Sequence, residues 1–238
     1  MTSPASHSHC TNRLAAIALA SMSVLVLVAL FHHPVVGHHA DAGDMLGQLA
    51  QLRVADQSVH AALIAMLTIL ASALGLAGQA LGGHRAVSAG ALGAYCLGCV
   101  LLGVAMLFDG FVVPRLAVQF LATAPENAAA GMLVLRAVSV MIQVLTKAGL
   151  IAQSLAMLAW AYAAATGSPA LPRLRWVAIV GVLAGAVPAA VIVSTDLRLE
   201  PQSLMALFAA QAAWYLVVAW QLAWPSCRAD PAAGRVTP

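Results

Sequence analysis

The stretch "LAAIALASMSVLVLVALF", residues 14–31, carries no charged side chain at any position. An α-helix rises about 1.5 Å per residue, so about 20 predominantly apolar residues cross the hydrocarbon core of a bilayer. Five further segments of similar character follow along the chain. The sequence therefore predicts six transmembrane helices, over about 14–31, 59–82, 87–113, 138–163, 177–195 and 203–224.

The composition agrees with lipid as the main solvent of this chain. Hydrophobic residues make up 62% of the 238 positions and charged residues 8%, whereas about a quarter of the residues in a soluble domain are charged. We expect an all-α integral membrane bundle in a single domain over 14–224. Two short cytoplasmic tails, 1–13 and 225–238, flank it.

The expected partners follow from the same composition. The net charge of +3 forms no basic block, and aromatic residues make up only 5% of the chain. A nucleic-acid partner is therefore not expected, because such a partner requires a dense positive surface. The lipid bilayer is the expected surrounding, with a membrane-protein partner or a second copy of the chain as the interacting protein.

Lysine and arginine are unevenly divided between the two sides that six spans create. Six arginines lie on the side of both termini, and three or four basic residues lie on the other side. Cytoplasmic loops carry the excess of positive charge, so we expect both termini in the cytoplasm. We assign the chain to the inner membrane as a multi-pass protein, with the connections 32–57, 114–137 and 196–202 on the outer side.

The connection after the first span is rich in histidine. It begins "HHPVVGHHADAGD", residues 32–44, and holds four of the eight histidines of the chain. Asp56 and His60 follow one helical turn apart, so they share a helix face. Imidazole nitrogens bind zinc, copper or nickel, and carboxylates can complete the ligand shell. The candidate metal ligands are His32, His33, His38, His39, Asp41, Asp44, Asp56 and His60.

A purely structural interpretation of this connection stays open. Its spacing matches no defined metal-binding motif, and paired histidines also occur in turns that bind nothing. Asp41 or Asp44 would then cap a short helix that runs on into the second span.

Asp109 lies inside the third predicted span, near its outer end. A carboxylate in hydrocarbon is costly, so it should face the bundle and have a partner. Arg136, Gln143 and Lys147 recur at intervals of seven and four residues, which places them on one stripe of the fourth span. We expect an ion pair of Asp109 with Arg136 or Lys147. It would be either a structural pair near the interface, which we prefer, or part of a hydrated pocket that opens outward.

Three classes of function fit these features. The first is a small polytopic partner or scaffold protein without chemistry of its own, which requires the fewest assumptions. The second is a transporter or sensor for a divalent metal ion or protons that uses the histidine-rich connection and the Asp109 region. The third is a membrane enzyme with Asp56 and His60 as an acid–base pair. The sequence contains no hydrolase, phosphate-loop or dinucleotide-binding motif, so an enzyme is not the first expectation.

Overall fold

The computed structural model describes residues 4–34, 41–78, 81, 85–122, 128–166 and 174–223, with side chains except at 4–10, 85 and 128. Within these ranges the chain is helical and forms no strand. The helices are α1 (Pro4–Phe31), α2 (Ala42–Gln51), α3 (Arg53–Ala77), α4 (Arg85–Leu107), η1 (Phe108–Val112), α5 (Val113–Leu121), α6 (Ala128–Thr166), α7 (Leu174–Ser194) and α8 (Pro201–Ala223).

Six of the described helical segments are long and apolar enough to cross a membrane. Their mean hydropathy runs from 1.5 to 2.7 over the best windows. This confirms the prediction of an all-α protein with six helices of membrane-spanning length. The segments are Thr11–Phe31, Arg53–Ala77, Ala86–Leu121, Ala129–Thr166, Leu174–Ser194 and Pro201–Ala223.

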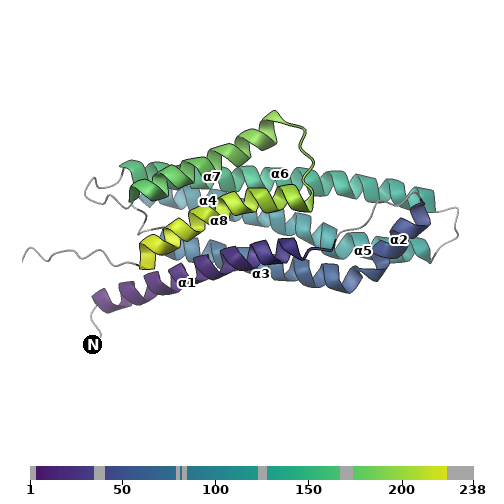
Figure 1. Ribbon diagram of the computed structural model, residues 1–238, viewed down its shortest axis with the longest axis horizontal. Helices are drawn as coiled ribbons and strands as arrows, with labels where there is room; N and C mark the ends of the chain where they lie inside the picture. Colours follow the sequence, from purple (N-terminus) through teal and green to yellow (C-terminus); the bar gives the residue numbers. More distant parts are fainter. Residues whose placement is uncertain are drawn as a thin grey trace, which may run out of the picture.

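The six long helices lie side by side in an elongated bundle (Figure 1). α4 packs against α6, α6 against α7, and α1 against both α3 and α8. The beginning of α1 and the end of α8 lie at the same end of the bundle, on the left in Figure 1. α2 lies at the opposite end, which we call the α2 end.

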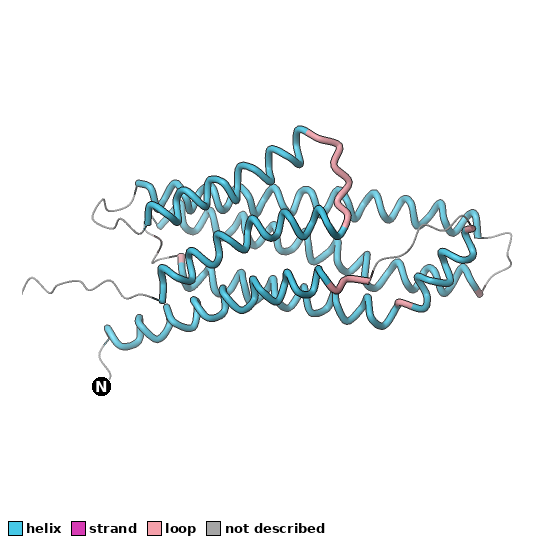
Figure 2. The backbone as a smooth tube through the Cα atoms, in the orientation of Figure 1, coloured by secondary structure: helices cyan, strands magenta, loops and turns pink. Residues whose placement is uncertain are grey.

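Two helical segments extend well beyond the others at the α2 end. α6 has 39 residues, about 58 Å at the usual rise, whereas the hydrocarbon core is about 30 Å thick. α4, η1 and α5 form a second continuous helical path of similar length, as the tube in Figure 2 shows. Together with α2, these segments form an extension past the ends of α1 and α8 (Figure 1).

The extension has a small apolar core of its own. Leu46 of α2, Ala117 of α5 and Leu135 of α6 are buried against one another. The predicted connection over 114–137 is therefore helical where it is described, since α5 occupies its first part and α6 begins at Ala128. The fourth predicted span, 138–163, is part of a longer helix.

A capped helix precedes α3, as the aspartate positions indicate. The side chain of Asp41 accepts hydrogen bonds from the amides of Gly43 (3.0 Å) and Asp44 (3.2 Å), which satisfies donors at the start of α2. Only Leu52 separates α2 from Arg53, the first residue of α3. The predicted helix that leads into the second span is confirmed.

Aromatic side chains fill the half of the bundle near the chain termini. The indoles of Trp160 and Trp214 stack at 5.7 Å with an interplanar angle of 21°. The Trp214 indole N–H donates to the Val177 carbonyl at 3.1 Å. The hydroxyls of Tyr95 and Tyr215 share a buried hydrogen bond of 2.8 Å. This half of the bundle is tightly packed and pairs the Trp214 indole and both tyrosine hydroxyls internally. The indole N–H of Trp160 is buried without a hydrogen-bond partner among the described residues.

Close backbone contact joins α4 to α6. A Cβ atom at Gly98 would lie 2.7 Å from the Gly149 carbonyl oxygen, and one at Gly149 would lie 3.0 Å from the Gly98 carbonyl oxygen. Only glycine fits this approach without displacement of a backbone, and small residues are typical of helix interfaces in membranes. This contact fixes α4 and α6 against each other, on the side of the candidate site that faces the chain termini.

Candidate metal centre and adjoining cavity

His60 is the central residue of the candidate site. It lies in the second turn of α3, and its side chain is only 4% exposed. Its Nδ1 donates to the main-chain carbonyl of Asp56 at 2.9 Å and lies 3.2 Å from the Asp56 carboxylate. A carbonyl oxygen can only accept, so Nδ1 carries the hydrogen and Nε2 is left for other partners. The predicted pairing of these two residues across one helical turn is confirmed.

His33 approaches the same point from the end of α1. Its Nδ1 donates to the carbonyl of Pro34 at 2.9 Å, so its Nε2 is also left for other partners. This Nε2 lies 3.5 Å from the Nε2 of His60 and 3.7 Å from the carboxylate of Asp56. The two rings meet nearly at right angles, 82°.

Asp109 supplies a third ligand atom. Its Oδ2 lies 3.3 Å from the Nε2 of His60. One ligand atom each from His33, His60 and Asp109 falls within 4.8 Å of the other two. We call these three residues, with Asp56 behind them, the candidate metal centre. The side chain of Asp109 is 44% exposed, so the centre is open on that side.

A single π-helical turn, η1, sets the direction of this carboxylate. The amide of Val113 donates to the carbonyl of Phe108, five residues earlier, where an α-helix would use four. Pro114 follows directly. It offers no N–H to the carbonyl of Gly110, and its ring would clash with that carbonyl in a regular α-helix. A widened turn relieves this conflict, and such turns recur at functional sites.

Gly110 allows the centre to close. A Cβ atom at this position would lie 2.6 Å from both Cβ and Cγ of His60. His60 therefore packs directly on the backbone of η1, and a larger residue at position 110 would displace the imidazole. Gly110 is not among the site residues predicted from the sequence. The sequence feature that could have identified it is the pair of Gly110 and Pro114, which lie four residues apart at the end of an apolar run.

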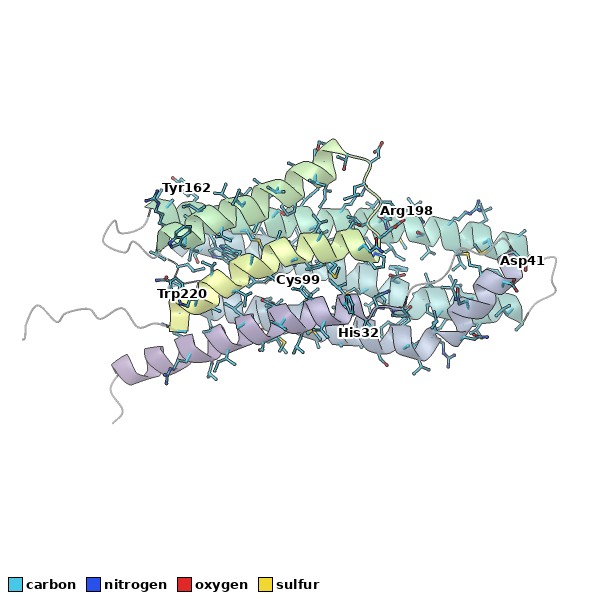
Figure 3. All side chains as sticks on the ribbon, in the orientation of Figure 1. His32, Asp41, Cys99, Tyr162, Arg198 and Trp220 are labelled. Carbon is cyan, nitrogen blue, oxygen red and sulfur yellow. The ribbon has the colours of Figure 1, made fainter. Side chains whose placement is uncertain are left out.

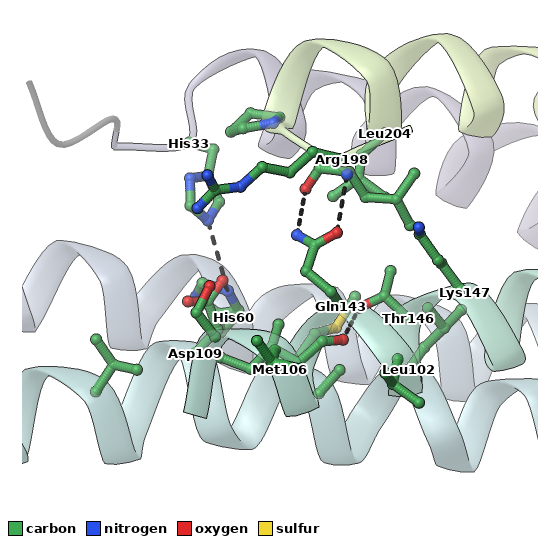
Figure 4. A pocket seen from close by; sticks show the side chains of 18 of the residues that line it. His33, His60, Leu102, Met106, Asp109, Gln143, Thr146, Lys147, Arg198 and Leu204 are labelled. Atoms are coloured by element: carbon green, nitrogen blue, oxygen red, sulfur yellow. Dashed lines mark hydrogen bonds and ion pairs between the residues drawn. The ribbon is translucent and has the colours of Figure 1, made fainter. Parts of the chain in front are cut away.

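The candidate metal centre forms one wall of a cavity of about 940 Å³. The cavity lies where the bundle meets the extension, because α1, α2, α3, η1, α6 and α8 all contribute to it. His33, His60 and Asp109 gather on one side of it in Figure 4. Arg136, Gln143, Lys147 and Arg198 also line the cavity.

Gln143 connects α6 to the segment between α7 and α8. Its amide nitrogen donates to the carbonyl of Leu199, and its amide oxygen accepts from the Leu199 N–H, both at 2.9 Å (Figure 4). The buried backbone of Leu199 is thereby fully paired. The role of Gln143 as a clamp does not follow from its sequence spacing.

The predicted stripe on α6 faces the cavity, but the ion pairing differs from the prediction. Arg136, Gln143 and Lys147 all line the cavity, as does Asp109. Within the described ranges, however, the only ion-pair partner of Asp109 is His60, and no pair joins it to Arg136 or Lys147. The expected pair is replaced by a contact with an imidazole on α3.

The structure separates several residues of the predicted ligand set. His32 packs edge-on against Phe31 and is exposed, and Asp41 caps α2 at the far tip of the extension (Figure 3). Asp44, in the first turn of α2, is exposed as well. These three side chains are not part of the three-residue ligand cluster. His38 and His39 lie outside the described residues.

No protein-family model, curated protein or solved structure matches the chain. Two imidazole nitrogens and one carboxylate oxygen form a ligand set typical of zinc and of other first-row transition metals. Three protein ligands leave coordination positions for water or an exchanging ligand. The arrangement is therefore suited to reversible binding.

Proposed function

We propose that this protein binds a divalent transition-metal ion, with zinc as the first candidate, and acts as a metal sensor or as the entry site of a metal transporter. The proposed ligands are Nε2 of His33, Nε2 of His60 and a carboxylate oxygen of Asp109. The sequence alone favours a partner or scaffold protein. The convergence of these three ligand atoms on one cavity favours metal binding instead.

The observation that carries the proposal is the orientation of the two imidazoles. Each ring donates its Nδ1 hydrogen to a main-chain carbonyl, of Asp56 for His60 and of Pro34 for His33. Metal-binding histidines usually make this type of hydrogen bond, which fixes the tautomer and the direction of the free nitrogen. Two neutral rings with hydrogen on Nδ1 would direct lone pairs at each other across 3.5 Å, so the contact calls for a positive charge, either a metal ion or a second proton on His60.

Two of the three separations between the ligand atoms fit a small tetrahedral ion, and all three atoms lie within 4.8 Å of one another. Zinc–nitrogen bonds of about 2.0–2.1 Å place two ligands of a tetrahedron about 3.3 Å apart. The Nε2 atoms of the two histidines are 3.5 Å apart, and Nε2 of His60 lies 3.3 Å from Asp109. The ligand set favours zinc over calcium or magnesium, which prefer oxygen ligands alone.

The surroundings of the site support exchange rather than a purely structural ion. The exposed side of Asp109 leads into the cavity, so a fourth ligand can enter and leave. The arginine distribution favours both termini in the cytoplasm, which supports metal uptake from the outer side. The packed aromatic half of the bundle then separates the site from the cytoplasm.

Metal titration of the purified protein tests this proposal. We expect one zinc ion per chain at micromolar free metal, measured by equilibrium dialysis with elemental analysis, and weaker or competing binding of copper and nickel. His33→Ala, His60→Ala and Asp109→Asn should each weaken zinc binding by at least about 100-fold, since even second-shell losses cost about 10–100-fold.

His32→Ala is the matched control, because it removes the neighbouring imidazole that faces away from the centre. It should leave zinc affinity unchanged. Two results would overturn the proposal: wild-type protein that binds less than one ion per chain, or a His32→Ala variant that loses as much affinity as His33→Ala. Thermal unfolding in detergent confirms that the compared variants are folded.

A further inference from the structure

Three basic side chains line the cavity without an ion-pair partner. Arg136 and Lys147 come from α6, and Arg198 comes from the segment between α7 and α8. Every ion pair in the described part of the chain belongs to the candidate metal centre, so none involves these three cations. Asp196 is the remaining acidic side chain in the lining, since Asp109 faces His60. Apart from the residues of the candidate metal centre, the lining therefore carries a net positive charge.

The rest of the lining is largely apolar. Leu63 of α3, Met106 of α4 and Phe208 of α8 contribute to the walls on the bundle side. On the α6 side, Val140 and Val144 line the cavity and are 63% and 60% exposed. The cavity thus opens between apolar side chains, and an opening of this kind suits a hydrocarbon chain better than water.

The position of the cavity matches the boundary of a bilayer. α1 ends at Phe31, and α8 begins at Pro201, beside the cavity. The extension and the first turns of α3 continue past this level (Figure 1). A membrane that covers the six-helix bundle would therefore end near the cavity. Basic pockets between transmembrane helices are known to bind anionic lipid headgroups on the cytoplasmic side of membranes, and the same charge attraction acts at either boundary.

The clamp made by Gln143 holds one of the three cations in place. Gln143 lies seven residues after Arg136 and four before Lys147, on the same stripe of α6. Its two hydrogen bonds to Leu199 attach the segment that carries Arg198 to this stripe. The backbone of the segment that carries Arg198 is therefore fixed against α6 before any ligand binds.

We propose that this cavity binds an anionic phospholipid from the surrounding bilayer. Arg136, Lys147 and Arg198 would contact the phosphate and headgroup oxygens, and an acyl chain would lie against Met106 and Phe208. The inference does not depend on the proposed metal site, because none of these side chains belongs to the metal centre.

Native mass spectrometry of the full chain in detergent tests this inference. Phosphatidylglycerol and phosphatidylcholine with identical dioleoyl chains serve as probes, and EDTA is present throughout so that metal binding cannot contribute. We expect phosphatidylglycerol to bind at least about tenfold more tightly than phosphatidylcholine, because each basic side chain near the headgroup favours the anionic lipid. Equal affinity for the two lipids would overturn the proposal.

Two triple variants with the same change in net charge locate the site. Arg136→Gln/Lys147→Met/Arg198→Gln removes the cations of the cavity, and Arg53→Gln/Arg115→Gln/Arg175→Gln removes exposed cations elsewhere. The cavity variant should lose the preference for phosphatidylglycerol, and the control should keep it. An equal loss in both would refute the site. If the triple variant does not fold, Lys147→Met alone repeats the comparison. We expect it to lose a smaller part of the preference for phosphatidylglycerol.

Two further measurements separate a lipid from a free anion. Leu204→Trp places a larger side chain in the apolar lining and should weaken phosphatidylglycerol binding while all three cations remain. Soluble glycerol phosphate should compete poorly, since it lacks the acyl chains. Competition at equal concentration, together with an unaffected Leu204→Trp variant, would show a site for a free phosphate anion and overturn the lipid assignment.

Discussion

The Nε2 atoms of His33 and His60 lie 3.5 Å apart, although the two histidines are 27 positions apart in sequence. Both rings are held in this position through Nδ1 by main-chain carbonyls, which do not change with side-chain substitution nearby. The site is therefore arranged by the backbone of α1 and α3 before a ligand enters, and such preorganisation lowers the free-energy cost of binding.

Zinc affinity should fall as the pH is lowered. A ligating imidazole must offer an unprotonated Nε2, and protons compete for the same lone pairs on His33 and His60. We expect the apparent dissociation constant to rise steadily from pH 8 to pH 6, and binding to release protons. Calorimetry in two buffers with different ionisation enthalpies measures the proton release. An affinity that is constant across this range would contradict coordination by the two histidines.

Asp56→Asn should weaken zinc binding by about 10–100-fold without removing it, as is typical of second-shell changes. The substitution leaves the main-chain carbonyl that orients His60 but removes the negative charge 3.2 Å from its Nδ1. Equilibrium dialysis measures the change. Asp44→Asn is the control, because Asp44 is exposed in α2 and outside the cluster. Complete loss of binding in Asp56→Asn would instead indicate that Asp56 is a direct ligand.

Gly110→Ala should abolish tight zinc binding while the protein stays folded. The added methyl would lie 2.6 Å from Cβ and Cγ of His60, so α3 and η1 must separate and the ligand atoms must move apart. Gly103→Ala is the matched control on the same helical path, since a Cβ atom there meets nothing within 4 Å. The control should keep its zinc affinity and unfold at the same or a slightly higher temperature, because alanine favours helix over glycine.

The sequence predicted the features that depend on one helix at a time. The apolar runs specify the six long helices, and spacing within a helix places Asp56 beside His60 and aligns Arg136 with Lys147. These relations follow from the period of the helix alone. A periodic pattern fixes which residues share a face, and the structure agrees with it at each of these positions.

Relations between helices could not be predicted in the same way. The partner of Asp109 depends on how far α3 slides along α4, and that offset is set by the contact of His60 with Gly110. The spacing of residues within α6 carries no information about the offset between α3 and α4. The sequence therefore predicted Arg136 or Lys147 as the partner of Asp109, and the structure has His60 instead. Which of the two adjacent histidines faces the candidate metal centre likewise depends on the direction of the chain after α1. His33 faces the centre, and His32, one residue earlier, faces away from it.

The clamp between Gln143 and Leu199 yields a prediction for the segment that carries Arg198. Gln143→Leu leaves both backbone groups of Leu199 without this partner, and Leu199 is only 4% exposed. Loss of a hydrogen-bond partner at a buried polar group costs about 1–3 kcal/mol. We therefore expect the Leu199 amide to exchange its hydrogen at least about tenfold faster, as hydrogen–deuterium exchange mass spectrometry would show for the peptide over 196–200.

Two further variants separate loss of the clamp from a general loss of stability. Gln143→Glu keeps an acceptor for the Leu199 N–H but has no donor for its carbonyl, so its effect should be intermediate. Gln119→Leu replaces an exposed glutamine on α5 and should leave exchange over 196–200 unchanged. If Gln143→Leu accelerates exchange equally over 196–200 and in the core of α6, the substitution destabilises the whole bundle, and Gln143 does not act as a local clamp. If acceleration is confined to 196–200, the amide of Gln143 is what holds this segment against α6.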